Sequence, residues 1–318
     1  MTGQGGTPEG RVADAAAGNW VDDRAPRWAR AYLRLSRADR PIGTWLLLLP
    51  CWWGVLLSAA SGDGLGWHGA WILVGCAAGA WLMRGAGCTW NDVTDRDIDA
   101  GVARTRSRPI PSGSVGVRGA LAWMCVQALV AFGILLTFNL SAILLGILSL
   151  ALVCVYPFAK RFTWWPQVFL GLAFNWGALL AWTAHDGALG WPAILLYLGG
   201  IAWTLFYDTI YALQDVEDDA LIGVKSTARL FGAHAPRWLA GFACLSVILI
   251  GAAVVVAFGG NGRGGLVALA GVGAMGAHMA WQLRALDGQD VAVCLRLFRS
   301  NRDAGLFVAA GFALAALV

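Results

Sequence analysis

Residues 84–113 read RGAGCTWNDVTDRDIDAGVARTRSRPIPSG, an apolar stretch that becomes acidic and then basic. Its acidic part, called the first acidic segment below, contains Asn91, Asp92, Asp95, Asp97 and Asp99. In a helix, Asn91, Asp95 and Asp99 are spaced i, i+4 and i+8, which predicts that all three project from one face. Ionisable groups at the end of an apolar helix are costly to bury, so this stretch is a candidate functional site.

A second acidic segment occurs at the end of another apolar run, in residues 207–225 (YDTIYALQDVEDDALIGVK). Asp208, Asp215 and Asp219 stand there at i, i+7 and i+11, again on one face of a helix. Asp97 lies off the face of the first segment, and we expect it to be solvated. Two acidic helix faces are therefore the feature that a function must explain.

The composition predicts that these segments belong to a membrane protein. The chain of 318 residues is 58% hydrophobic and only 13% charged, with 42 Gly and 18 Trp, which is unlike a soluble domain. Nine apolar segments have the length of a membrane-crossing helix; they are 41–60, 66–90, 117–138, 140–157, 163–184, 189–211, 236–259, 264–283 and 304–318. The runs are continuous rather than alternating, which argues against a barrel. We expect an all-α polytopic fold, with about nine transmembrane helices in one bundle around a central cavity that faces the cytoplasm.

The positive charges fall in every second loop between these segments. Arg118 follows the second segment, Lys160 and Arg161 follow the fourth, and Lys225 follows the sixth, whereas only Arg263 breaks the pattern. Positive charge marks the cytoplasmic side of a membrane protein. We therefore expect a multi-pass protein of a bacterial inner (plasma) membrane, embedded in the lipid bilayer, with its N-terminus and both acidic segments on the cytoplasmic side.

The N-terminal residues differ from the rest in composition. Residues 1–35 are polar and rich in Gly, Ala and Arg, which predicts a disordered or interfacial tail rather than a transit peptide. Residues 36–318 are expected to form a single transmembrane domain, because no loop between the segments is long enough for a soluble one. No nucleic-acid partner is expected, and the sequence does not identify any protein partners.

Clustered carboxylates repel one another, and a divalent cation removes that repulsion. Mg²⁺ prefers oxygen ligands and is commonly held by one or two carboxylates while substrate phosphates complete its coordination. Basic side chains follow the acids and can neutralise phosphate charge; they are Arg104, Arg108, Arg161 and Lys225. The two segments together therefore suit a diphosphate bridged by Mg²⁺, and their position on apolar helices indicates that the diphosphate belongs to a lipid.

The residues that carry this chemistry also show a family resemblance. NDVTDRDID matches NDxxDxxxD and DVEDD matches DxxxD, the paired aspartate motifs of the UbiA-type membrane prenyltransferases. RPIGTWLLLLP, RTRSRPIPSG, YPFAKRFTWWPQVFLGLAFNW and GVKSTARLFG resemble the branch of that family that acts on 4-hydroxybenzoate. These blocks lie between residues 40 and 232, which is most of the apolar part of the chain.

The resemblance implies an enzyme that transfers a polyprenyl group from polyprenyl diphosphate to a ring carbon of 4-hydroxybenzoate, as in ubiquinone biosynthesis, with Mg²⁺ as cofactor. The catalytic residues would be Asp95, Asp99, Asp215 and Asp219. The metal ligands would be Asn91, Asp92, Asp95, Asp99, Asp215 and Asp219. The substrate-binding residues would be Arg40, Arg104, Arg108, Arg161, Lys225, Tyr207 and Asp208. For the carboxylate of the acceptor, an anion that acidic segments would repel, the candidates are Arg40 and Arg161.

Other functions are compatible with parts of this pattern. The acceptor could be haem, a naphthoate or a chlorophyll precursor, since the aspartates act on the donor. A cation-coupled transporter would explain membrane carboxylates but not the basic residues that follow them. A phosphatidyl-type transferase also uses membrane aspartates, but its DGxxAR motif is absent from the sequence. Release of diphosphate from a prenyl donor distinguishes a prenyltransferase from the transporter and from the phosphatidyl-type transferase.

Overall fold

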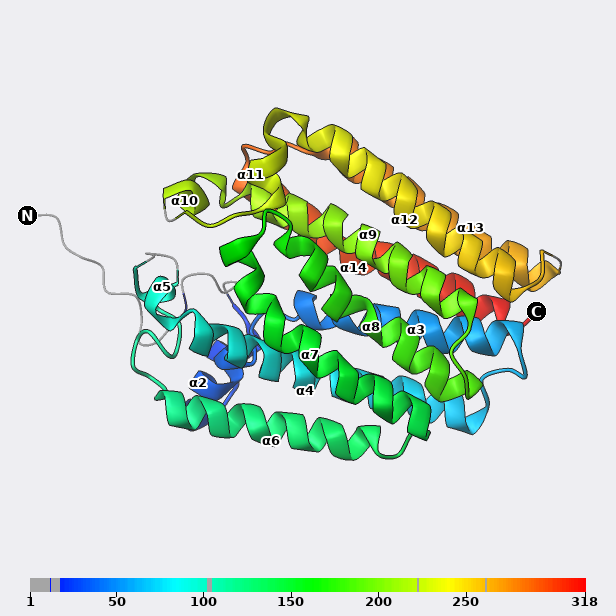
Figure 1. The fold of residues 1–318 in the computed structure, drawn as a ribbon, viewed down its shortest axis with the longest axis horizontal. Helices are drawn as coiled ribbons and strands as arrows, with labels where there is room; N and C mark the ends of the chain where they lie inside the picture. Colours follow the sequence, from blue (N-terminus) through cyan, green and yellow to red (C-terminus); the bar gives the residue numbers. More distant parts are fainter. Residues whose placement is uncertain (1–11, 13–17, 102–104, 222, 261) are drawn as a thin grey trace, which may run out of the picture. The chain divides into compact units, whose positions relative to one another are not determined.

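The computed structural model describes residues 12, 18–101, 105–221, 223–260 and 262–318, and within these ranges it contains helices and no strand. The elements are, in order, α1 Trp20–Asp23, α2 Arg27–Leu35, α3 Ile42–Ser61, α4 Gly66–Thr94, α5 Arg96–Gly101, α6 Val117–Leu135, α7 Leu140–Phe162, α8 Pro166–Asp186, α9 Trp191–Leu213, α10 Val216–Leu221, α11 Thr227–Phe231, η1 Gly232–His234, α12 Ala235–Ala257, α13 Arg263–Ala285 and α14 Val291–Ala315 (Figure 1). The predicted all-α fold is confirmed.

Eight of the described helices are long and apolar enough to cross a membrane, judged by length and composition alone. They correspond to the first eight predicted segments. The ninth predicted segment, 304–318, lies within α14. This helix begins at Val291 and not at residue 304 as predicted. Its first half carries Arg296, Arg299, Arg302 and Asp303, so an apolar pattern reveals only its second half. The chain is therefore a multi-pass membrane protein.

Side chains at the helix ends explain where several helices begin and stop. Asn139 caps α7 by accepting a hydrogen bond from the N–H of Ala142 at 2.9 Å. Asp290 caps α14 in the same way, through the N–H groups of Ala292 and Val293. Helix α8 stops at Gly187, whose φ of 90° lies in the left-handed region that favours glycine. Two polar caps and one glycine thus mark these helix ends.

The described residues belong to two compact units. The first comprises Met1–Thr44 and Ala78–Ile134, and the second comprises Trp45–Ala77 and Leu135–Val318. The predicted division into a tail of residues 1–35 and a domain of residues 36–318 stays a prediction. Helices α1 and α2 lie within that tail, whereas residues 1–11 and 13–17 are outside the described ranges.

In the second unit, α9 packs against α8, α12 and α14 (Figure 1). Trp203, Phe206 and Ile210 of α9 are fully buried in this packing. Helices α13 and α14 approach closely at two glycines, because a Cβ on Gly271 would lie 2.9 Å from the Cα of Gly311. Small residues allow such backbone contacts between membrane helices.

The first unit joins α2, the end of α4, α5 and α6. Leu35, Val115 and Ala120 form its buried apolar cluster, with Tyr32 and Val93 packed against them. Val93 lies within the first acidic segment, so this cluster contacts the end of α4 that carries Asn91 and Asp92. The predicted central cavity and its orientation toward the cytoplasm stay predictions.

Candidate active site

The first acidic segment lies where the long helix α4 gives way to the short helix α5. Helix α4 ends at Thr94, and Asp95 forms a break of one residue before α5. The N–H of Asp95 nevertheless donates to the carbonyl of Asn91 at 2.9 Å, and that of Asp99 donates to the carbonyl of Asp95 at 2.8 Å. The backbone therefore follows a helical path through the segment, as its spacing predicts.

Burial differs sharply among the acids of this segment. Asp92, Asp95 and Asp99 are buried, with exposed fractions of 0%, 1% and 6%. Asn91 is only partly buried. The side chain of Asp97 is 89% exposed, which confirms that this residue is solvated. The most buried acidic face thus contains Asp92 in place of Asn91, at i, i+3 and i+7.

Two arginines neutralise this buried face. Nη2 of Arg37 lies 2.6 Å from Oδ1 of Asp92. Nη1 of Arg108 lies 2.8 Å from Oδ2 of Asp99 and 3.6 Å from Oδ1 of Asp92. The hydroxyl of Thr105 donates to the backbone carbonyl of Asp99 at 2.9 Å and so fixes the loop that leads to Arg108. An ion pair of this kind offsets the free-energy cost of burying each charge.

Burial raises the pKa of Asp99 above its ordinary value. The nearby charges of Asp92 and Asp95 raise this pKa as well, whereas Arg108 lowers it, and the net shift is upward. The first acidic segment is therefore a place where a further positive charge would be favourable.

Arg37 is the residue of this site that the sequence analysis did not identify. Its φ of 56° makes it the one non-glycine residue with a positive φ in the described ranges. The neighbouring Ser36 holds it in place: the hydroxyl donates to Oε1 of Gln127 at 3.0 Å and accepts from Nε1 of Trp123 at 2.8 Å. Such strain persists only where the surroundings over-determine the conformation. No local sequence pattern marks a tertiary contact of this kind.

The second acidic segment has the same local construction. Helix α9 ends at Leu213, Asp215 lies in a two-residue break, and α10 follows from Val216. Asp215 therefore corresponds to Asp95, and Asp219 in α10 corresponds to Asp99 in α5. Asp208 and Asp215 are partly buried, whereas the side chain of Asp219 is outside the described part of the structure.

Hydrogen bonds fix the chain beyond this segment to the preceding helices. The hydroxyls of Thr209 and Thr227 are 2.7 Å apart, and the N–H of Thr227 donates to Oε1 of Gln167 at 3.2 Å. The N–H of Lys225 donates to the carbonyl of Lys160 at 3.4 Å. Lys225 is thus brought beside the basic end of α7, although the two are far apart in sequence.

The remaining predicted substrate residues are more dispersed. Arg40 pairs with Asp39 at 3.2 Å. Arg161 is exposed at the end of α7, with its guanidinium carbon 5.2 Å from the centroid of the Phe158 ring. Tyr207 is buried, and its hydroxyl accepts a hydrogen bond from Thr204 at 3.0 Å. Its ring lies 5.1 Å from that of Trp203, which gives it a packing role in the second unit. Arg104 lies outside the described residues.

The donor atoms of the first acidic segment suit a divalent metal that is shared with a substrate. Among the described residues no group of three His, Cys, Asp or Glu side chains is gathered to hold a metal ion by itself. Oδ2 of Asp92, however, is buried and has no hydrogen-bond partner among the residues that the structure describes. A buried carboxylate oxygen without a donor favours a cation, and Mg²⁺ needs only one or two carboxylates when phosphate oxygens are present. The residues therefore fit Mg²⁺ held jointly with a substrate.

Comparison with known proteins adds relatives that cover most of the chain. The rat protein "4-hydroxybenzoate polyprenyltransferase, mitochondrial" is 46% identical over 311 residues, which cover 97% of this chain and 80% of the relative. The human protein of the same name is 46% identical over 309 residues, covering 96% and 81%. The Arabidopsis thaliana protein of that name is 45% identical over 298 residues, covering 93% and 71%.

Solved structures show the same fold. The apo structure of a UbiA homolog from Aeropyrum pernix superposes with a TM-score of 0.68 at 24% identity, over 85% of this chain and 97% of the other. A UbiA homolog from Archaeoglobus fulgidus bound to GPP and Mg²⁺ gives 0.67 at 22% identity, over 91% and 100%. The sequence model of the UbiA prenyltransferase family matches residues 47–314. Together with the two acidic segments, these matches show that the chain belongs to the UbiA prenyltransferase family.

Proposed function

We propose that this protein transfers a polyprenyl group from polyprenyl diphosphate to a ring carbon of 4-hydroxybenzoate and releases diphosphate, as a step of ubiquinone biosynthesis. The observation that carries the proposal is the 46% identity, over 97% of the chain, to a relative named for this reaction. The construction of the two acidic segments supports it independently, because both present carboxylates beside basic residues.

The proposed Mg²⁺ ligands are drawn from both acidic segments. They are Asn91, Asp92, Asp95, Asp99, Asp215 and Asp219, with catalytic roles for Asp95, Asp99, Asp215 and Asp219. When bound, Mg²⁺ stabilises the charge that develops on the departing diphosphate. Asp92 would contribute Oδ2, the oxygen that Arg37 and Arg108 leave uncovered. Asp208, on α9, would support the second set of ligands.

The basic residues are proposed to bind the diphosphate. Arg108 already contacts two carboxylates, but a guanidinium has five N–H donors and can bind phosphate oxygens at the same time. Arg104 and Lys225 would add charge from their own segments. Tyr207 would limit the depth of the substrate site through its rigid, buried ring.

In the reaction the bond between C1 of the prenyl group and the diphosphate oxygen breaks, and the electron pair leaves with the diphosphate. A ring carbon beside the hydroxyl of the acceptor forms the new C–C bond and then loses its proton. Water must be excluded meanwhile, because it would react with the allylic cation. The buried state of Asp92, Asp95 and Asp99 is consistent with such a protected site.

Arg161 is proposed to bind the carboxylate of the acceptor. The resemblance of YPFAKRFT to the 4-hydroxybenzoate branch of the family favours Arg161 over the other candidate, Arg40, which pairs with Asp39. Replacement of Arg161 by Ala should raise KM for 4-hydroxybenzoate and leave KM for the donor almost unchanged. A rise in donor KM alone would assign Arg161 to the diphosphate, and unchanged kinetics would assign it to the membrane surface.

We propose a bacterial inner membrane as the location, with the N-terminus and both acidic segments on the cytoplasmic side. The distribution of Arg and Lys over alternate loops supports this orientation. The relatives named above are mitochondrial. Labelling from outside intact cells tests the orientation: a cysteine introduced at Asp63 should react with an impermeant maleimide, and one introduced at Arg118 should react only after lysis.

The activity is tested with membranes from cells that express the full chain. They are incubated with Mg²⁺, 4-hydroxybenzoate and prenyl diphosphates of several chain lengths, and products are identified by mass spectrometry. A prenylated hydroxybenzoate that is absent with the Asp95→Ala variant is expected. Prenylation of a naphthoate or a haem precursor instead would keep the prenyl transfer but overturn the acceptor, and no release of diphosphate with any acceptor would overturn both.

A further inference from the structure

A surface pocket on α12, separate from both acidic segments, is lined by Arg237, Trp238, Gly241, Phe242 and Leu245, and is called the α12 groove here. Its volume is about 420 Å³, and its lining is mostly apolar. Sites of this size in proteins commonly bind small molecules or lipid segments. The groove opens on the outside of a helix that is apolar enough to cross a membrane.

The two aromatic side chains that line the groove, Trp238 and Phe242, pack against further rings outside the lining. Trp238 stacks on Phe231 with centroids 4.7 Å apart and planes at 12°. Trp165 meets Phe231 edge-on at 5.4 Å, and Phe242 lies 6.0 Å from Trp238. Packed rings cannot fold into the groove to close it, so the groove exists before a ligand binds. Binding to a preformed surface costs less ordering entropy.

The floor of the groove is open because of Gly241. A Cβ on this residue would meet no atom within 4 Å. Trp238 and Leu245, which flank it at i−3 and i+4 on the same helix face, are each 46% exposed. The glycine thus leaves an apolar channel along the helix axis between two large side chains, which suits an extended hydrocarbon chain.

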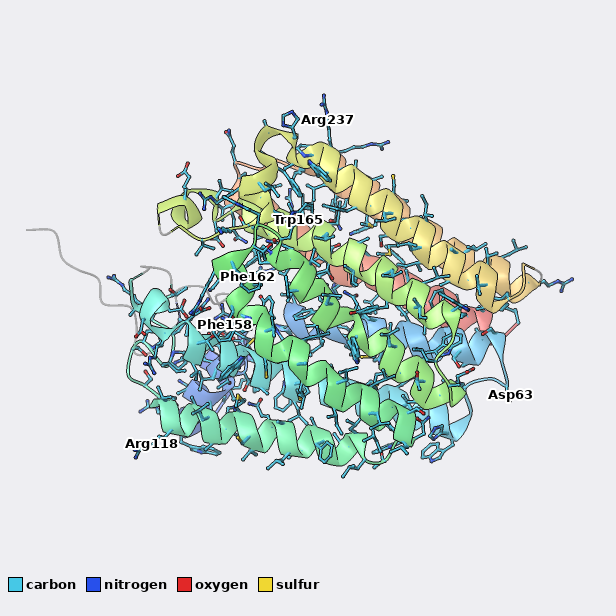
Figure 2. The ribbon with its side chains drawn as sticks, viewed as in Figure 1. Asp63, Arg118, Phe158, Phe162, Trp165 and Arg237 are labelled. Carbon is cyan, nitrogen blue, oxygen red and sulfur yellow. The ribbon has the colours of Figure 1, made fainter. Side chains whose placement is uncertain are left out.

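A cation stands at one end of this channel. Arg237 is exposed at the N-terminal end of α12 (Figure 2). It forms no ion pair with any carboxylate in the part of the chain that the structure describes. Tryptophan beside it is a side chain typical of the membrane–water interface. A cation, an interfacial ring and an apolar channel therefore follow one another along the helix.

We propose that the α12 groove binds one anionic phospholipid, with the phosphate on Arg237 and an acyl chain over Gly241. Charge complementarity selects the headgroup, because guanidinium binds phosphate through paired hydrogen bonds. The anionic lipids of a cytoplasmic leaflet are attracted to basic residues at helix ends. The lipid would hold α12 at a fixed depth and cover the two aromatic side chains that line the groove.

The test is native mass spectrometry of the purified full chain titrated with phosphatidylglycerol or phosphatidylcholine. The wild-type protein should retain phosphatidylglycerol about fivefold more strongly, the effect of one basic residue near a membrane surface. Arg237→Gln should remove this preference, whereas Arg263→Gln, at the opposite end of the helix pair α12 and α13, should keep it. Gly241→Leu should weaken retention of the lipid by filling the channel.

Gly273→Leu is the matched control for the channel, because Gly273 is exposed on α13 and a Cβ there also meets no atom within 4 Å. Circular dichroism identifies any variant that fails to fold. If Arg237→Gln fails to fold, the wild type is compared with Arg237→Lys, which keeps the charge and should keep the preference for phosphatidylglycerol. Equal retention of both lipids by the wild type would overturn the proposal. Competition by inorganic phosphate alone would show a simple anion site and would also overturn it, as would equal lipid loss in the two leucine variants.

Discussion

At the scale of single residues, the first acidic segment separates buried from exposed carboxylates within one turn of chain. Replacement of Asp95, Asp99, Asp215 or Asp219 by Ala should lower kcat/KM by about 100-fold or more, because a lost ligand forfeits charge stabilisation in the transition state. Asp97→Ala is the matched control, since Asp97 lies in α5 with a side chain that is 89% exposed. Prenyl transfer measured in membranes with matched protein levels gives the comparison. An equal loss at Asp97 would contradict the assignment of the acidic face.

Arg37 permits a separate prediction about stability. Arg37→Ala removes the nearer of the two arginines that contact the buried Asp92 and should destabilise the first unit by about 3–5 kcal/mol. Arg37→Gly removes the same pair but relieves the positive φ, so it should be about 1 kcal/mol less destabilising than the alanine variant. Thermal unfolding in detergent compares the two. Equal Tm values would show that the backbone conformation at this position carries no strain.

At the scale of helices, Gly85 on α4 marks a close contact. A Cβ there would overlap Oε1 of Gln127 and lie 2.9 Å from Cβ of Ser36, the residue that holds Arg37. Gly85→Ala should therefore destabilise the protein by about 1–3 kcal/mol and reduce activity. Gly79→Ala, in the same helix with no atom within 4 Å of the added Cβ, should be neutral or slightly stabilising.

A second substitution should partly restore the stability of the Gly85→Ala variant. Shortening Gln127 to Ala in the Gly85→Ala background removes the main overlap and should restore part of the lost Tm. Thermal unfolding and prenyl transfer of the single and double variants measure this coupling. If both glycine variants behave alike, the contact between α4 and α6 does not limit the geometry of the first acidic segment.

At the scale of the whole molecule, two segments far apart in sequence are proposed to act on one metal-bound diphosphate. Removal of divalent cations with EDTA should abolish turnover, and Mg²⁺ should restore it. Diphosphate release measured before and after dialysis tests this. Full activity in metal-free buffer would remove the basis of the proposed mechanism.

Much of the fold could be predicted from the sequence because apolar length is a local property. The predicted segments 41–60 and 66–90 agree with α3 and α4 to within a few residues. The predicted start of α14 was wrong because the first half of this helix is charged. The solvation of Asp97 likewise followed from spacing alone.

The site was less predictable wherever tertiary contacts decide it. Helical spacing selected Asn91 for the buried face, but Asp92 is the more deeply buried residue, and it pairs with Arg37 and Arg108. The sequence marked Tyr207 only as a neighbour of Asp208, and its packing against Trp203 depends on the rest of the second unit. Such pairings join residues that no local pattern connects.

The pairing of Arg37 with Asp92 also constrains the order of events while the chain is being synthesised. The two residues are 55 positions apart, and residues 45–77 between them belong to the second unit. Arg37 therefore leaves the ribosome well before its carboxylate exists, and it must wait in water at the membrane surface, since an unpaired guanidinium enters lipid only at high cost. The contact between Arg37 and Asp92 can therefore form only after residues 45–77, which belong to the second unit, have been synthesised.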